Sequence, residues 1–129
     1  MKIEHLAIWV DDIEVMRQFY MTYFNMVSSD KYVNPKKEYI SYFLQPEESY
    51  TRIELMHRPD INDNTGKRGF TKGIAHFSLS VGNKTAVDEL TERLRVDNYN
   101  IESEPRTTGD RYYESVILDP EGNYIEITI

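Results

Sequence analysis

The stretch "IEHLAIWVDD" at residues 3–12 returns in altered form as "IAHFSLSVGN" at residues 74–83. The two copies place His5 and His76 at the same position of the repeat. Later in each half, "FLQPEESYTRIEL" at 43–55 resembles "ILDPEGNYIEI" at 117–127. Because the repeat occurs only twice and is too long for most solenoid units, it predicts a pair of stacked modules.

Both halves show the same order of hydrophobic patterns. In each half, apolar and polar residues alternate in the predicted strands, and apolar residues recur at helical spacing directly after the first strand. The first half predicts a strand at 3–10, a helix at 12–24 and strands near 26–33, 38–45 and 51–57. The second half predicts a strand at 74–81, a helix at 84–97 and strands near 100–104, 111–118 and 123–128. The order βαβββ, written twice, predicts an α+β fold.

Polar residues mark where the predicted helices begin and end. Asp11 is the predicted N-cap of the first helix, with Glu14 in capping-box position three residues later. Asn25 is placed to end that helix, and Asn83 to cap the second. The stretch "RPDINDNTGKRGFTKG" at 58–73 is rich in Gly, Asp, Asn and Lys and is the predicted connecting loop. It separates module 1 at about 1–57 from module 2 at about 74–129. Long loops of this kind are often functional.

The composition limits the classes of function. The chain has 129 residues, a net charge of −7 and no cysteine, so we expect a single domain over 1–129. Its acidity disfavours binding to nucleic acid or anionic membrane, and no apolar run approaches the roughly 18–20 residues that cross a bilayer. The absence of cysteine excludes disulfides and thiolate metal sites and fits a reducing, cytoplasmic location, and the N-terminus does not resemble a signal peptide.

Strand alternation predicts that four possible metal ligands share one side of the sheets. Leu6, Ile8 and Val10 form the apolar face that should pack on the helices, so His5 points to the opposite face. The same alternation turns three further side chains away from the helices: His76, Glu54 and Glu126.

Two neutral imidazoles and two carboxylates suit a divalent metal, and the absence of sulfur leaves Zn, Ni, Co, Mn and Fe all plausible. A lone histidine or glutamate on a strand is more often a hydrogen-bonded or solvated residue than a ligand. Inheritance of the repeat could also preserve the four residues without a function. His57 has the opposite parity from Glu54 and is interpreted as structural.

The sequence resembles the vicinal oxygen chelate superfamily, which includes glyoxalase I, fosfomycin-resistance proteins, extradiol dioxygenases and bleomycin-binding proteins. The resemblance is carried by "HLAIWVDDIEVMRQFY" at 5–20, "HFSLSV" at 76–81 and "DPEGNYIEI" at 119–127. It implies that the paired βαβββ modules form a curved, cup-like mixed sheet with helices on the outer face. It is closest to short bacterial glyoxalase I, whose His, Glu, His, Glu ligand pattern falls on His5, Glu54, His76 and Glu126.

The resemblance implies a metal-dependent lyase of the lactoylglutathione lyase type, acting on the hemithioacetal of a 2-oxoaldehyde. Glu126 is the expected proton-transferring base, with Glu54 as the alternative on the opposite side. The family usually has Arg where this chain has Trp9, and often Asn where it has Arg58, so glutathione itself is doubtful. Trp9, Met56 and Arg58 are the expected substrate-binding residues, and Arg52, Tyr124 and Thr128 share the ligand side of their strands.

Two other functions remain open for this resemblance. A fosfomycin-type thiol transferase would need only His5, His76 and Glu126. A metal-free drug-binding protein would use the chain's ten Tyr, five Phe and one Trp to line a cavity. Members of the family commonly dimerise, which implies a homodimer whose sites take His5 and Glu54 from one chain and His76 and Glu126 from its partner. The other arrangement closes both modules of one chain around their own metal.

Overall fold

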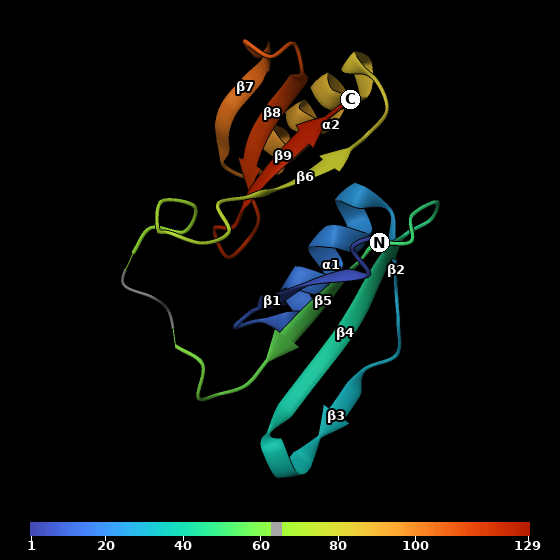
Figure 1. The fold of residues 1–129 in the computed structure, drawn as a ribbon, viewed down its shortest axis with the longest axis vertical. Coiled ribbons are helices and arrows are strands. Elements are labelled where there is room, and N and C mark those ends of the chain that lie inside the picture. The colour runs from blue at the N-terminus through green and yellow to red at the C-terminus, as the bar shows by residue number, and fades with distance from the viewer. Residues whose placement is uncertain (63–65) are drawn as a thin grey trace. The chain divides into compact units, whose positions relative to one another are not determined.

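The computed structural model describes residues 1–62 and 66–129, which divide into two compact units, Met1–Asp63 and Asn64–Ile129 (Figure 1). We call them module 1 and module 2. Module 1 contains β1 (His5–Trp9), α1 (Ile13–Phe24), β2 (Met26–Ser28), β3 (Tyr32–Asn34), a 3-10 turn (Pro35–Lys37), β4 (Tyr39–Pro46) and β5 (Arg52–His57). Module 2 contains β6 (Phe77–Ser80), α2 (Lys84–Val96), β7 (Ile101–Thr107), β8 (Tyr113–Leu118) and β9 (Tyr124–Thr128). The predicted α+β class is confirmed. None of the helices in these ranges is long and apolar enough to span a membrane.

The sheet of module 1 has the strand order β1-β5-β4-β2, with β3 also paired to β4. β1 runs parallel to β5, and the other pairs are antiparallel. Helix α1 contacts β2, β4 and β5 and covers one face. Met16, Tyr20, Leu44 and Leu55 are completely buried between helix and sheet. The opposite face is therefore free to carry polar side chains.

The first helix begins one residue later than predicted. The N-cap is Asp12, whose side chain accepts hydrogen bonds from the backbone N–H groups of Glu14 and Val15. The prediction of Asp11 was wrong, because either of two adjacent aspartates offers the same capping chemistry. Glu14 consequently makes no capping box and instead accepts a hydrogen bond from Tyr42 Oη at 2.9 Å. Asn25 ends the helix in the left-handed conformation, as predicted.

The strand predicted at 26–33 is interrupted. β2 and β3 pair with different parts of β4, and Ser29 lies between them. Ser29 remains attached to β4: its N–H donates to the Phe43 carbonyl at 2.8 Å, and its hydroxyl accepts from the Phe43 N–H at 3.0 Å. A side-chain acceptor therefore replaces a backbone acceptor here and breaks the regular ladder.

Module 2 repeats this plan with the strand order β6-β9-β8-β7, and α2 contacts β7, β8 and β9 (Figure 1). Asn83 caps α2 by accepting from the Ala86 N–H at 2.9 Å, as predicted. The core between α2 and the sheet includes the completely buried Val87, Leu94, Ile117, Ile125 and Ile127. In both modules the first strand lies at an edge of its sheet, β1 in one and β6 in the other.

The described end of the predicted connecting loop packs against β9. Arg68 Nη1 donates to Asn123 Oδ1 at 3.0 Å, and the rings of Phe70 and Tyr124 meet edge to face at 5.6 Å. Gly69 has φ +78, and a Cβ there would lie 2.8 Å from the Tyr124 ring and 3.0 Å from the Ala75 carbonyl. Only glycine fits this close approach. Residues 63–65 of the predicted loop lie outside the described residues.

Candidate metal site

Module 1 brings His5 and Glu54 together on the face of its sheet that α1 does not cover. His5 is the first residue of the edge strand β1. Glu54 lies on the neighbouring strand β5, opposite Ala7 in the register. His5 Nε2 lies 3.7 Å from Glu54 Oε2. The Glu54 side chain is 15% exposed and the His5 side chain 40% exposed. The pair is therefore accessible at the sheet edge, with the carboxylate as the more enclosed partner.

Other side chains of module 1 fix this pair. Glu4 contacts His5 Nδ1 and is itself contacted by Arg52. A carboxylate on Nδ1 favours the tautomer that leaves Nε2 as a lone-pair donor. Tyr39 Oη donates to Glu54 Oε1 at 2.9 Å, and burial together with this hydrogen bond raises the pKa of Tyr39. The phenol therefore stays protonated and leaves Oε2 of Glu54 directed at His5.

Module 2 brings His76 and Glu126 together in the same way. His76 directly precedes β6, Glu126 lies on the neighbouring β9, and His76 Nε2 is 3.2 Å from Glu126 Oε1. The exposed fractions are 46% for the imidazole and 21% for the carboxylate. This pair opens into a cavity of about 300 Å³ whose other walls include Phe70, Val116 and Tyr124.

A third carboxylate, Glu114, lies on the same face of module 2. It pairs with Thr128 across β8 and β9, two residues along β8 from Val116, which is opposite Glu126. Burial raises the pKa of Glu114, and the charge of Glu126 raises it further. Arg106 Nη2, at 3.8 Å, partly compensates this charge. Glu114 is therefore a partly buried acid next to a predicted ligand.

The geometry of both pairs fits adjacent ligands of one metal ion. Metal–nitrogen and metal–oxygen bonds of about 2.1 Å put two neighbouring ligand atoms about 3.0–3.4 Å apart. The 3.2 Å separation in module 2 lies in this range, and the 3.7 Å separation in module 1 needs a shift of only a few tenths of an ångström. Together the pairs supply two nitrogens and two anionic oxygens, a set that suits a divalent cation. Within residues 1–62 and 66–129, no three or more potential ligands form one group that could hold a metal ion.

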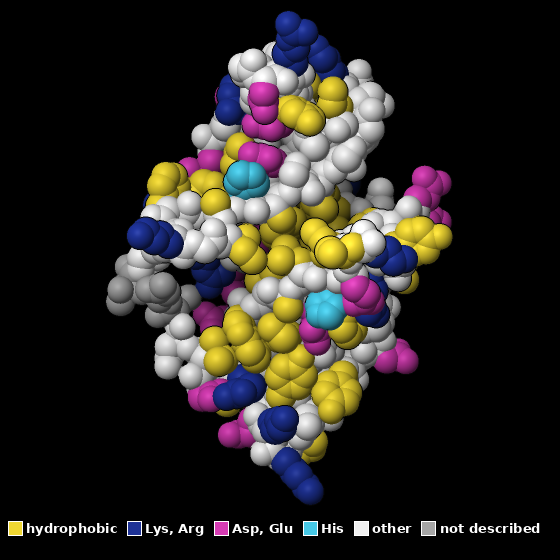
Figure 2. All heavy atoms as spheres, in the orientation of Figure 1, with side chains coloured by type: hydrophobic (Ala, Val, Ile, Leu, Met, Phe, Trp, Pro, Cys, Tyr) yellow, Lys and Arg dark blue, Asp and Glu magenta, His cyan; other side chains and the backbone are white. Residues whose placement is uncertain are grey.

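The predicted substrate-binding residues lie on the same face of module 1. Trp9 is 37% exposed and meets Tyr39 edge to face at 6.2 Å, while Met56 is opposite Trp9 in the register. Arg58 lies 6.0 Å from the Trp9 ring, but its Nε donates to Asp60 Oδ1 at 2.7 Å and its Nη2 contacts the other oxygen. The charge of Arg58 is thus already neutralised, which makes it a weak replacement for a free arginine. Figure 2 shows hydrophobic side chains gathered over module 1, in the lower part of the view.

His57 lies on the opposite side of its strand and has a structural contact, as interpreted from the sequence. Its Nδ1 lies 2.9 Å from the Val10 carbonyl, which ties the end of β5 to the end of β1.

Sequence reasoning missed four residues around the two pairs: Glu4, Tyr39, Phe43 and Glu114. The parity of β4 and β8 could have placed Phe43 and Glu114 on the ligand face, since each lies on a predicted strand. Glu4 precedes β1, so alternation does not determine where its side chain points. The hydrogen bond from Tyr39 to Glu54 depends on strand pairing that a single sequence does not reveal.

Two βαβββ modules, each with a histidine and a glutamate paired near the edge of its sheet, define a class of duplicated-module proteins. The chain belongs to the Glyoxalase/Bleomycin resistance protein/Dioxygenase superfamily, whose model matches residues 2–127. No curated protein sequence matches the chain significantly.

Solved structures with the same fold have low sequence identity. Glyoxalase I of Leishmania major, described as trypanothione-dependent, is 25% identical with a TM-score of 0.77, over 99% of this chain and 86% of that chain. A glyoxylase/bleomycin resistance protein/dioxygenase domain from Frankia sp. EAN1pec is 16% identical with a TM-score of 0.81, over 100% and 97%. Glyoxalase I from Zea mays is 22% identical with a TM-score of 0.79, over 98% and 44%. The chain thus spans less than half the length of the maize protein.

Proposed function

We propose that this protein is a metal-dependent isomerase of the glyoxalase I type, which converts the hemithioacetal of a 2-oxoaldehyde into a thioester of a 2-hydroxy acid. The observation that carries the proposal is the matched pairing of His5 with Glu54 at 3.7 Å and of His76 with Glu126 at 3.2 Å. Membership of the superfamily and the likeness to the Leishmania enzyme support it. Any of Ni, Zn, Co, Mn or Fe suits such a ligand set.

His5, Glu54, His76 and Glu126 would hold the metal. When bound, the ion supplies Lewis-acid stabilisation to the negative charge that develops on the substrate oxygens, worth several kcal/mol. The chain's own groups then move the proton. A carboxylate takes the proton from the carbon that carries the sulfur, and a carbon–carbon double bond forms in the enediolate. The same carboxylic acid returns the proton to the neighbouring carbon, while the hydroxyl proton of the hemithioacetal passes to the oxygen of that neighbouring carbon. Atoms and charge balance without a co-reactant.

Glu126 is the better candidate for this base. One oxygen of Glu54 accepts the hydrogen bond from Tyr39, and the other faces His5. Among the described residues, the Glu126 carboxylate forms an ion pair only with His76, and it borders the 300 Å³ cavity in which a substrate could lie. Glu126 therefore has an oxygen available for proton transfer, whereas the Tyr39 contact fits Glu54 to a holding role.

We further propose a homodimer in which each complete site takes the His5–Glu54 pair from one chain and the His76–Glu126 pair from its partner. The position of β1 and β6 at sheet edges supports this arrangement, because edge strands can join another sheet without disturbing a packed core. A cytoplasmic location remains a prediction from the sequence.

The decisive experiment combines elemental analysis of the purified protein with a methylglyoxal assay. The protein is loaded with Ni, Co or Zn, and hemithioacetals of several thiols are offered. We expect one divalent ion per quartet and thioester formation with at least one thiol. Bound metal without turnover would reject the isomerase, whereas no metal at all would favour the metal-free binding protein.

A further inference from the structure

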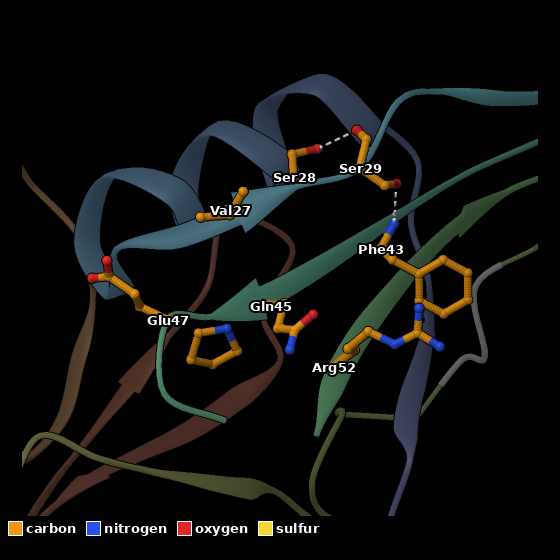
Figure 3. A pocket seen from close by; sticks show the side chains of 8 residues that line it. Val27, Ser28, Ser29, Phe43, Gln45, Glu47 and Arg52 are labelled. Carbon is orange, nitrogen blue, oxygen red and sulfur yellow. Dashed lines mark hydrogen bonds between the residues drawn. The ribbon is translucent and has the colours of Figure 1, made fainter. Parts of the chain in front are cut away.

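We propose that a pocket of module 1 beside His5 is a subsite for a carboxylate carried by the substrate, with Arg52 as the residue that selects it. The pocket has a volume of about 390 Å³ (Figure 3). It lies on the same face of the sheet as the His5–Glu54 pair, because Arg52 and Phe43 in its lining are opposite His5 and Glu54 in the register. Its lining includes Val27, Phe43, Gln45 and Arg52. The inference rests on the proposed function and specifies its substrate class.

Phe43 connects this pocket to the candidate metal ligands. Its ring meets the His5 ring edge to face at 5.5 Å, and Phe43 is opposite Glu54 in the register of β4 and β5. Arg52 is likewise opposite His5 in the register of β1 and β5. The Phe43 ring therefore separates the His5–Glu54 pair from the pocket. A substrate whose reacting carbons lie at that pair can extend over this ring into the pocket.

Arg52 is held in place and keeps free donors. Its guanidinium lies 4.1 Å from the centre of the Phe43 ring, and its Nη2 contacts Glu4. Among the described residues these are its only polar or ring partners, so Nε and Nη1 retain N–H groups for a ligand. A planar guanidinium with free N–H groups matches the geometry of a carboxylate.

The remainder of the pocket suits a short carbon chain that ends in an acid. Val27 and Phe43 supply apolar surface, and the Gln45 amide already donates to the Ser49 carbonyl at 2.7 Å. The one acidic side chain of the lining, Glu47, projects at the opposite end of the pocket from Arg52 (Figure 3). The carboxylate next to an anion bound at Arg52 is therefore Glu4, which contacts Nη2 alone, and not Glu47.

The test compares substrates that differ in one carboxylate. The first acidic substrate is the hemithioacetal of methylglyoxal with mercaptoacetate, which carries the carboxylate on the thiol. Its neutral reference is the hemithioacetal of methylglyoxal with 2-mercaptoethanol. The hemithioacetal of 4,5-dioxopentanoate with 2-mercaptoethanol places the acid on the aldehyde. Because charge-assisted hydrogen bonds contribute about 1.5–3 kcal/mol, we expect at least one acidic substrate to be favoured about tenfold or more in kcat/KM.

The variant Arg52→Met removes the guanidinium and keeps an apolar side chain of similar reach. We expect it to abolish the preference mainly through KM, while Arg52→Lys retains part of it. Arg95→Met is the matched control, since Arg95 contacts only Glu92 and Glu104 in module 2. A fall in kcat that is equal for acidic and neutral substrates would instead reflect disturbance of Glu4 and His5. A preference that survives in Arg52→Met, or that disappears equally in Arg95→Met, overturns the subsite.

A binding measurement separates this inference from the proposed function. Propionate is titrated into metal-loaded protein, with propionamide as the uncharged control, and the backbone amide signals of Phe43, Gln45 and Arg52 are followed by NMR. We expect shifts with propionate in the parent protein and in Arg95→Met, but not in Arg52→Met. If the parent shows no shift, the subsite is rejected even if the isomerase is active. If the shifts appear without any turnover, the subsite stands and the isomerase is rejected.

Discussion

The two modules place the same pair of residues at the same positions of their sheets, yet surround them differently. Glu4 contacts the imidazole in module 1, whereas Ala75 precedes His76 in module 2. By register, Arg52 and Phe43 beside Glu54 correspond to Tyr124 and Val116 beside Glu126. The backbone therefore repeats the ligand positions, while the side chains around them give module 1 the supporting contacts and module 2 the open carboxylate.

The largest expected effect is on catalysis and tests this division of roles. Glu126→Gln should lower kcat about a thousandfold, because it removes the proposed base while keeping its shape. Glu54→Gln should lower activity by about tenfold to a hundredfold, since an amide oxygen can still accept from Tyr39. Initial rates with methylglyoxal and the best thiol, together with metal content, measure both. A greater loss of activity in Glu54→Gln than in Glu126→Gln would mean that Glu54 is the base and that Glu126 only holds the metal.

Matched core substitutions test whether the hydrophobic cores of the two modules contribute equally to the free energy of unfolding. Leu55 and Ile127 follow the two glutamates and are both completely buried. Leu55→Ala and Ile127→Ala should each reduce the free energy of unfolding by about 3 kcal/mol, through lost burial and the cavity left behind. Urea denaturation provides the measurement, and Val27→Ala at an exposed position should change it by less than about 0.5 kcal/mol. Strongly unequal losses would show that the cores are not equivalent.

A smaller effect is expected where α1 is tied to its sheet. The hydrogen bond from Lys31, supported by Tyr42 and Arg17, lowers the pKa of Glu14 to about 2. Because the folded pKa lies below the ordinary 4.5, this contact stabilises the fold above pH 4.5, and the stabilisation is lost as pH falls toward 2. The side chain is 48% exposed, so solvent screening limits the contribution to about 1 kcal/mol at most.

Glu14→Gln should therefore destabilise the protein at pH 7 and leave its stability unchanged near pH 2. Thermal unfolding across this range measures the difference. Glu89→Gln, at an exposed position on α2, is the control for the loss of one surface carboxylate. A loss in Glu14→Gln that does not depend on pH would contradict the ionic origin of the contact.

The smallest effect concerns Glu114, which occupies the position that Ser41 has in module 1. Its pKa is raised by burial first and by Glu126 second, so ionisation of Glu114 disfavours the folded state as pH rises above 4.5. Glu114→Gln should increase the free energy of unfolding at pH 7 by about 0.5 kcal/mol and give no gain at pH 4. Chemical denaturation at both values checks the sign. A loss at pH 7 would mean that the contact with Arg106 outweighs the desolvation.

The sequence predicted the fold, and the sheet faces on which His5, Glu54, His76 and Glu126 lie, better than it predicted the surroundings of these residues. Alternation places His5 and Glu54 on one face because both lie within paired strands, and this holds whatever the neighbouring loops do. The N-cap was assigned to Asp11 where the structure uses Asp12, because local chemistry does not separate adjacent aspartates. The contact of Glu4 with His5 was invisible because Glu4 lies before β1. Arg58 was predicted to bind the substrate, but Asp60, two residues away, neutralises its charge. This contact depends on how the chain turns after β5, which the alternation of residues in a strand does not predict.

Trp9 is the one tryptophan of the chain, and it lies on the ligand face of module 1 near Tyr39. Its intrinsic fluorescence therefore reports on one module alone. Quenching or a spectral shift on addition of a compound would register an event near Trp9 and Tyr39. The chain thus carries a built-in optical label for one half of a duplicated architecture.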